Sequence, residues 1–125
     1  MAWELDSGRP IYIQLVERIQ MEIVSGQYPS GAKLPSVREL AAIAAVNPNT
    51  MQKAFVELER SGLIITQRTN GRTVTEDIEV IEGIRMQLAS ENMELFFKKM
   101  KELGVTKKEL LTLVEEKYEE GNGHE

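Results

Sequence analysis

The chain has 125 residues, of which 42% are hydrophobic, so it is long enough for one compact domain with a small appendage. It contains no cysteine, which excludes disulfides and thiol chemistry, and its apolar runs are too short to span a membrane. The N-terminal residues lack the basic and apolar blocks of a signal peptide, so we expect a cytoplasmic protein.

The formal net charge of −5 is distributed unevenly along the chain. Residues 1–75 contain 8 Lys+Arg against 7 Asp+Glu, whereas residues 76–125 contain 7 against 13. Because the distribution of charge governs attraction to a polyanion more than its sum does, the first part remains compatible with a small phosphate-binding surface.

The first predicted element is an amphipathic helix over residues 10–25, where Pro10 suits the first helical position and Gly26 the exit. Its apolar residues recur at the spacing of one helix face, at Tyr12, Leu15, Val16, Ile19 and Ile23. After turn residues 28–31, Lys33-Leu34-Pro35 is predicted to be extended, since the residue before a proline avoids helical geometry.

Two short helices are predicted to follow. Ser36 and Glu39 have the spacing of a capping box, so the second helix should begin at Ser36. Asn47 and Pro48 provide a cap and a first-turn proline for the third helix, which should end at residues 61–62. The buried face of this third helix is predicted to be Met51, Ala54, Phe55 and Leu58.

A β-hairpin is predicted next. Residues 63–68 and 72–75 have the composition of two strands, and Asn70-Gly71 is a strong signal for a two-residue turn between them. Arg68 and Arg72 flank this turn, so both guanidinium groups are expected on a projecting tip. Helix, helix, short turn, helix and hairpin is the element order of a winged helix-turn-helix.

Beyond Glu76 the chain is predicted to form two more helices. Gly104 is placed to end the first of them, and Thr106 and Glu109 form a second capping box that opens the other. The fold class is therefore α+β and mostly helical, with a winged helix-turn-helix domain at residues 1–75 and a helical segment at residues 76–125 whose C-terminus frays.

The fourth predicted helix has two apolar stripes, so it needs two partners, and a second subunit is the natural partner for one of them. The segment is therefore expected to form a homodimer. The predicted dimerisation residues are Ile81, Ile84, Leu88, Leu95, Phe96, Met100, Leu110 and Val114.

The third helix and the hairpin have the chemistry of a DNA-reading surface. The major groove admits one helix, and Asn and Gln can pair with adenine there, whereas arginine is favoured in the minor groove. The alternative is that a polar helix face and an arginine-bearing hairpin are simply solvated. The predicted DNA contacts are Ser36, Arg38, Asn47, Asn49, Thr50, Gln52, Lys53, Arg68, Asn70, Gly71 and Arg72.

Several motifs at fixed spacing resemble those of the GntR family of bacterial transcription regulators over about residues 9–75. They are Pro10-Ile11-Tyr12-x-Gln14-Leu15, Gly31-x-x-Leu34-Pro35-Ser36-x-Arg38-x-Leu40-Ala41, Val46-Asn47-x-x-Thr50, Ala54-Phe55-x-x-Leu58 and Gly62-Leu63-Ile64. The resemblance implies a winged helix-turn-helix regulator that binds a short, roughly palindromic operator in double-stranded DNA as a homodimer, with Arg38 on a phosphate or base. We expect it to act as a repressor.

Two positions depart from the family pattern. Thr69-Asn70-Gly71 stands where the family usually has Gly-x-Gly, and no aromatic residue lies near Thr73. The 50 residues after Thr75 are too few for a large effector-binding domain, and a short two-helix tail resembles the YtrA-type subfamily, whose tail serves dimerisation.

Two other classes of function remain as alternatives. An enzyme would need a cluster of reactive groups, but the chain has no cysteine and one histidine, His124, so we expect no catalytic residues, no cofactor and no metal. A winged-helix adaptor for other proteins would more often carry apolar residues on the third helix and wing. A small-molecule effector would have to bind between the tail helices or where they join the head.

Overall fold

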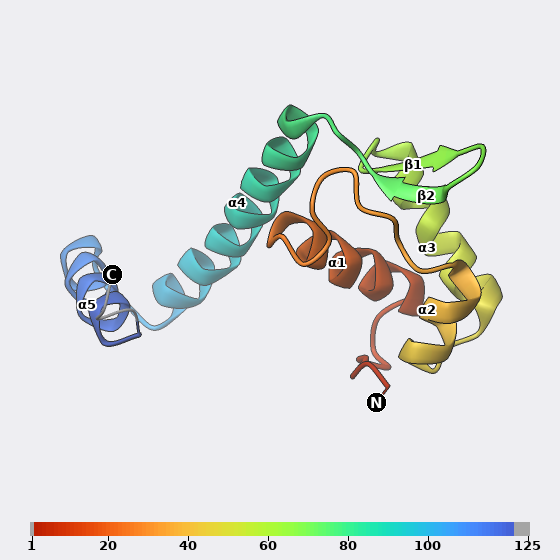
Figure 1. Ribbon diagram of the computed structural model, residues 1–125. Helices are drawn as coiled ribbons and strands as arrows, with labels where there is room; N and C mark the ends of the chain where they lie inside the picture. The colour runs from red at the N-terminus through yellow and green to blue at the C-terminus, as the bar shows by residue number, and fades with distance from the viewer. Residues whose placement is uncertain (1, 122–125) are drawn as a thin grey trace. The chain divides into compact units, whose positions relative to one another are not determined.

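The computed structural model describes residues 2–121, so His124 and the predicted fraying of the last residues lie outside the described part. Its elements are α1 (Ile11–Val24), α2 (Val37–Ala44), α3 (Pro48–Arg60), β1 (Ile64–Gln67), β2 (Gly71–Val74), α4 (Ile78–Glu102) and α5 (Lys107–Gly121) (Figure 1). The chain divides into two compact units, one ending at Met86 and one beginning at Gln87. We call the first unit the head. None of the described helices combines the length and apolar content needed to cross a bilayer.

The starts of α2 and α3 confirm the predicted caps. The Ser36 hydroxyl accepts from the Glu39 backbone N–H at 3.1 Å, and the Glu39 carboxylate accepts from the Ser36 N–H at 2.9 Å. The Asn47 side chain accepts from the backbone N–H of Asn49 at 2.7 Å, with Pro48 in the first turn. These local bonds satisfy N–H groups that a helix leaves free at its N-terminus, so both helix starts follow from the sequence.

The wing differs from the predicted hairpin in its turn. β1 and β2 pair antiparallel with Gln67 opposite Gly71, so the turn consists of three residues, Arg68, Thr69 and Asn70, rather than two. Gly71, the first residue after the turn, has φ +71°, in the left-handed region that favours glycine. The prediction of a two-residue turn at Asn70-Gly71 was wrong because Gly71 pairs with the opposite strand.

The segment before α2 pairs with the outer edge of β2. The N–H groups of Gly31 and Leu34 donate to Val74 O at 3.0 Å and Arg72 O at 2.9 Å, and Val74 N–H donates to Ala32 O at 2.9 Å. The sequence predicted an extended conformation here but not this partner. The pairing ties the N-terminus of α2 to the wing.

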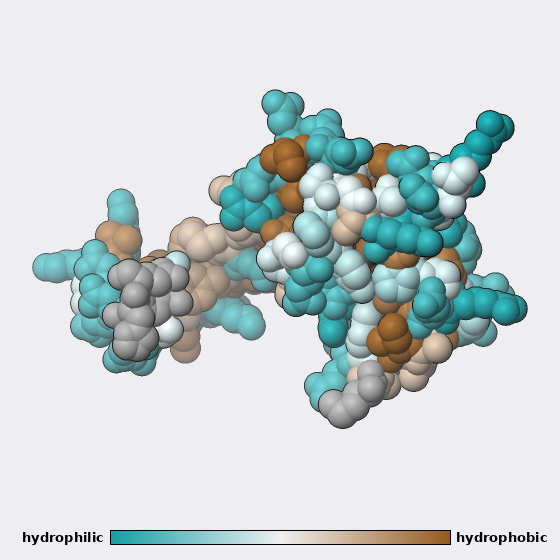
Figure 2. All heavy atoms as spheres, viewed as in Figure 1, coloured by the Kyte–Doolittle hydropathy of each residue, from teal (hydrophilic) through white to brown (hydrophobic). Residues whose placement is uncertain are grey.

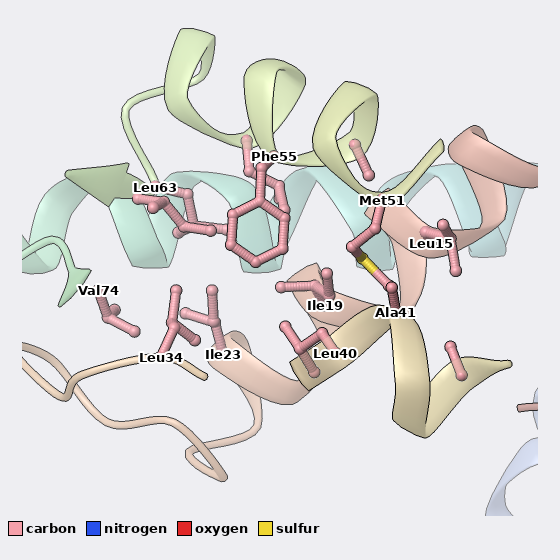
Figure 3. Close-up of a cluster of buried hydrophobic side chains, with 14 residues drawn as sticks. Leu15, Ile19, Ile23, Leu34, Leu40, Ala41, Met51, Phe55, Leu63 and Val74 are labelled. Carbon is pink, nitrogen blue, oxygen red and sulfur yellow. The ribbon is translucent and has the colours of Figure 1, made fainter. Parts of the chain in front are cut away.

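One hydrophobic core joins the elements of the head (Figure 3). Phe55 points from α3 into its centre, between Leu63, which directly precedes β1, and Ile19 of α1, and all three side chains are fully buried. The apolar helix faces supply most of its remaining members, whereas Leu34, Ile64 and Val74 come from the segment before α2 and from the two strands. The remaining members include Leu15, Ile23, Leu34, Leu40, Ala41, Ala44, Met51, Ala54, Leu58, Ile64 and Val74.

The first turns of α4 also pack against this core, through Val80, Ile81 and Ile84. Ile81 and Ile84 are also among the predicted dimerisation residues. In the structure these two side chains are partly covered by the head of their own chain, so they contribute to its core.

The second unit contains the rest of α4 together with α5. Gly104 has φ +76°, and the Val105 N–H reaches back to Met100 O at 3.1 Å, as the predicted helix end requires. Thr106 and Glu109 form the predicted capping box, with bonds of 2.9 and 3.2 Å. Within the described residues, no side chain of α4 or α5 is buried.

The turn between α2 and α3 contains a strained residue. Ala45 ends α2 with φ +61°, in the left-handed region, and the Val46 N–H bonds to Ala41 O at 3.0 Å. A side chain in that region crowds the following carbonyl and costs about 1–2 kcal/mol. This strain is offset by the packing of α2 on α3, which the sharp turn permits.

Replacing Ala45 with glycine should raise the free energy of unfolding by about 0.5–1 kcal/mol, because the relief of strain exceeds the entropy that glycine adds to the unfolded chain. Urea denaturation followed by circular dichroism measures this change. Ala42→Gly is the matched control, since Ala42 is exposed inside α2, and should cost about 1 kcal/mol. A loss of stability in Ala45→Gly would contradict the expectation.

Candidate nucleic-acid interface

The outer face of α3 is polar over its first two turns. Met51 and Phe55 anchor the helix in the core, which leaves Asn49, Gln52 and Lys53 exposed and Thr50 half-buried. These side chains offer amide donors and acceptors, a hydroxyl and an ammonium group within reach of one ligand surface. A helix in a major groove contacts base edges through hydrogen-bond donors and acceptors of these kinds.

Two of the predicted contacts have a second role as helix caps. The oxygens of Ser36 and Asn47 already accept backbone N–H groups, so what they can still offer to a ligand is the Ser36 hydroxyl proton and the Asn47 amide N–H groups. Arg38 is exposed in the first turn of α2, where free backbone N–H groups and the helix dipole also favour an anion.

Lys53 lies over the ring of Tyr12, with its Nζ 3.9 Å from the ring centroid. Tyr12 belongs to α1 and was predicted as part of the apolar face, but it is half-buried rather than buried. A cation on an aromatic face gains about 0.5–1 kcal/mol at an exposed site. The contact restricts the conformations of the Lys53 side chain. It joins two helices that are distant in the sequence, so no local sequence pattern predicts it.

The wing turn exposes Arg68 and Asn70, as predicted, whereas Arg72 is placed differently. The Arg72 Nε donates to Glu59 Oε1 at 2.8 Å, and its guanidinium carbon lies 5.3 Å from the ring centroid of Phe55. The expectation that both arginines project from the tip was therefore wrong for Arg72. In the actual register Arg72 pairs with Thr66, so its side chain leaves the turn and reaches α3.

Glu59 is the residue of this region that the sequence analysis missed. It also accepts a hydrogen bond from the Thr66 hydroxyl at 2.9 Å, so one carboxylate of α3 binds both strands of the wing. The hydrogen bond from Arg72 lowers the pKa of Glu59, with further lowering by Thr66 and by the charge of Arg72, against the opposing effect of partial burial. The sequence alone does not indicate the cluster of Glu59, Thr66 and Arg72, because it depends on the strand register that places Thr66 opposite Arg72.

Comparison with known proteins gives the family. Residues 11–74 match the family described as bacterial regulatory proteins, gntR family. This chain belongs to the GntR family. It is 41% identical over 90 residues to the HTH-type transcriptional repressor YtrA of Bacillus subtilis, a match that covers 70% of this chain and 68% of YtrA.

Two solved structures resemble the chain. A GntR family transcriptional regulator from Listeria monocytogenes is 42% identical and superposes with a TM-score of 0.83 over 90% of this chain and 98% of that one. The AraR DNA-binding domain in complex with operator ORX1 is 28% identical, with a TM-score of 0.51 over 60% of this chain and 92% of that one. The chain is thus a YtrA-like winged-helix transcription regulator, and its relatives are not enzymes.

The wing turn of this GntR protein contains the first departure from the family pattern. Asn70 stands at the middle of the three-residue motif that usually reads Gly-x-Gly, and Thr69 replaces its first glycine at the exposed turn. The remaining glycine, Gly71, is the one whose backbone has positive φ. The position after it carries Arg72, and its ion pair with Glu59 links the wing to α3.

Because the pKa of Glu59 is lowered in the folded protein, its ionised form stabilises the fold at neutral pH, and this contribution is lost as the pH falls through the lowered pKa. Glu59→Gln should lower the free energy of unfolding by about 1 kcal/mol at pH 7. The difference from the wild type should then shrink as the pH falls below about 4.3, the ordinary glutamate value.

Urea denaturation of both proteins between pH 3 and pH 7 tests this expectation. Glu57→Gln is the control on the same helix, because Glu57 pairs with the more exposed Arg60, and it should cost less. A Glu59→Gln effect that is absent at pH 7, or that persists undiminished in acid, would contradict the assignment.

Proposed function

We propose that this protein is a repressor that binds a palindromic operator as a homodimer, with α3 in the major groove and the β1–β2 wing in the minor groove. The observation that carries the proposal is the two-sided nature of α3. One side of the helix is buried in the core, and the other side exposes Asn49, Gln52 and Lys53 to solvent.

Each part of the head has a proposed role on DNA. The residues at the start of α3 read base edges, the exposed turn of the wing enters the minor groove, and the N-terminus of α2 binds the phosphate backbone. The proposed base contacts are Asn47, Asn49, Thr50, Gln52 and Lys53. The proposed wing contacts are Arg68, Asn70 and Gly71, and the proposed phosphate contacts are Ser36 and Arg38.

The AraR complex supports the DNA ligand, since a structure with this fold is bound there to an operator. The name of YtrA, a transcriptional repressor, supports the sign of the regulation. The head surface supports the same ligand, because Figure 2 shows it mostly hydrophilic in that view, with separate hydrophobic spots rather than one continuous patch. A surface that docks other proteins would more often be continuously apolar at its centre.

The second unit supports the homodimer. Its apolar side chains are partly or largely exposed, and they line hollows of about 460 and 530 Å³ between α4 and α5. Leaving such a surface in water costs about 25 cal/mol for each Å², and a second copy would supply a matching apolar face through a two-fold axis. The proposed dimer residues in this unit are Leu88, Leu95, Phe96, Met100, Leu110 and Val114.

Selection of bound fragments from a random DNA pool tests the function directly, and an inverted repeat should emerge. On that operator, Arg38→Ala should weaken binding to all sequences alike and reduce the slope of log K against log salt by about 1.8, because each of the two subunits no longer neutralises one phosphate. Asn49→Ala should instead relax preference at particular base pairs, by about 1–3 kcal/mol.

Arg85→Ala is the matched control for charge, since Arg85 is exposed on α4 and paired with Glu82. It should leave both the affinity and the salt slope within error. Failure of the wild-type protein to select any DNA sequence, or an Arg38→Ala salt slope equal to that of the wild type, would count against the proposal.

The homodimer is tested by placing charge in the apolar face. A Phe96→Glu, Val114→Glu double variant should sediment as a monomer at micromolar concentration, because two buried carboxylates would lose their hydration in the interface. Its affinity for the full operator should fall towards that for a half-site. Lys98→Glu is the control, as Lys98 is already exposed and charged, and it should remain dimeric. A wild type that sediments as a monomer would refute the homodimer.

A further inference from the structure

The carboxylate of Glu59 lies where the recognition helix α3 meets the wing. Its Oε2 accepts from Thr66 Oγ1 at 2.9 Å and its Oε1 accepts from Arg72 Nε at 2.8 Å. Thr66 and Arg72 are directly opposite each other on β1 and β2. One oxygen of the carboxylate is therefore bonded to each strand, so the wing is attached to α3 at two points.

A third contact completes the cluster. Phe55 precedes Glu59 by one helical turn, and the Arg72 guanidinium lies over its ring at 5.3 Å. Phe55 is fully buried, so the ring is held by the core. The side chains of Arg72 and Glu59 are only 27% and 32% exposed, which places their ion pair in a partly dehydrated setting where it is stronger than a surface pair.

We propose that Glu59, Thr66 and Arg72 form a clamp that sets the orientation of the wing relative to α3. In this assignment Arg72 is a positioning residue that acts through the wing rather than a contact to DNA. The clamp aligns the exposed Arg68 turn with the polar face of α3, so that both reach their grooves together. The assignment rests on the proposed function and specifies how its surface is held.

The short hairpin explains why a clamp is needed. β1 and β2 have four residues each, and a two-stranded hairpin of this size has little stability of its own. Pairing with the segment before α2 holds the outer edge of β2, whereas Glu59 holds both strands from the side of α3. Releasing Glu59 would let the turn that carries Arg68 move away from the helix.

The alternative is that Glu59 only masks an arginine that would otherwise bind a phosphate. The two explanations predict opposite effects of Glu59→Gln on DNA binding. If Glu59 only masks Arg72, Glu59→Gln should tighten DNA binding, because it removes a negative charge near a polyanion and frees the Arg72 guanidinium. Loss of the clamp should weaken binding in spite of the more favourable charge.

The experiment measures affinity for the selected operator over a range of salt concentrations, using the full chain and the variants Glu59→Gln, Arg72→Gln and the double variant. We expect each single variant to bind about tenfold more weakly, equivalent to about 1.4 kcal/mol. The double variant should be no weaker than either single one, because both remove the same clamp. Thr66→Val should cause a smaller loss in the same direction.

Two readouts separate positioning from general loss of structure. Hydroxyl-radical cleavage should show that Glu59→Gln and Arg72→Gln lose the same minor-groove protection as Arg68→Ala while keeping the contacts of α3. The salt slope should change equally in Glu59→Gln and Arg72→Gln, although the two variants remove opposite charges. Circular dichroism at the assay temperature checks that all variants are folded, and Thr66→Val provides a milder variant that retains the ion pair.

Tighter binding by Glu59→Gln would overturn the clamp while leaving the DNA-binding function intact. An Arg72→Gln loss that persists in full in the Glu59→Gln background would also overturn it, since Arg72 would then act on DNA independently. A wild type that selects no DNA would overturn both the clamp and the function on which it rests.

Discussion

The structure of the head depends on α3 being anchored in the core along one side and free along the other. Met51, Phe55 and Leu58 are fully buried, and α3 contacts α1, α2 and β1. Because those contacts hold the helix from three directions, its polar side has a fixed position relative to the rest of the head. A surface that reads a nucleic acid needs this rigidity, since a shift of a side chain by a fraction of its length moves it from one base edge to another.

The same anchoring determines how the neighbouring elements are placed. α2 meets α3 across a turn that requires Ala45 in the left-handed region, and the segment leading into α2 pairs with β2. The start of α2, the start of α3 and the wing are thereby linked through backbone hydrogen bonds and one core. Arg38, at the start of α2, belongs to the same unit as α3, so the proposed phosphate contact at one helix and the proposed base contacts at the other would be geometrically coupled.

Local chemistry made most of the fold predictable, and contacts between distant residues account for what was missed. The capping boxes at Ser36 and Thr106, the cap at Asn47 and the apolar helix faces are decided by residues within one or two turns, and these predictions are confirmed. Arg72 was misplaced because the direction of its side chain depends on the strand register: a two-residue turn at residues 70–71 would pair Arg72 with Thr69, whereas the structure pairs it with Thr66. The contact of Lys53 with Tyr12 depends on how α1 packs against α3, which periodicity does not specify.

The first turns of α4 and the rest of the helix have different surroundings, although the periodicity of the sequence suggests one continuous apolar surface. Its first turns cover the core through Val80, Ile81 and Ile84, whereas no side chain of the helix is completely buried. The apolar stripe is continuous in the sequence, but the residues of it that pack against the head core lie in the first turns of α4. Its later side chains, from Leu88 on, are partly or largely exposed. A dimer of the proposed kind, formed through this later part, would leave the contacts of Val80, Ile81 and Ile84 with the head core unchanged, so a variant that loses assembly is expected to keep its head folded.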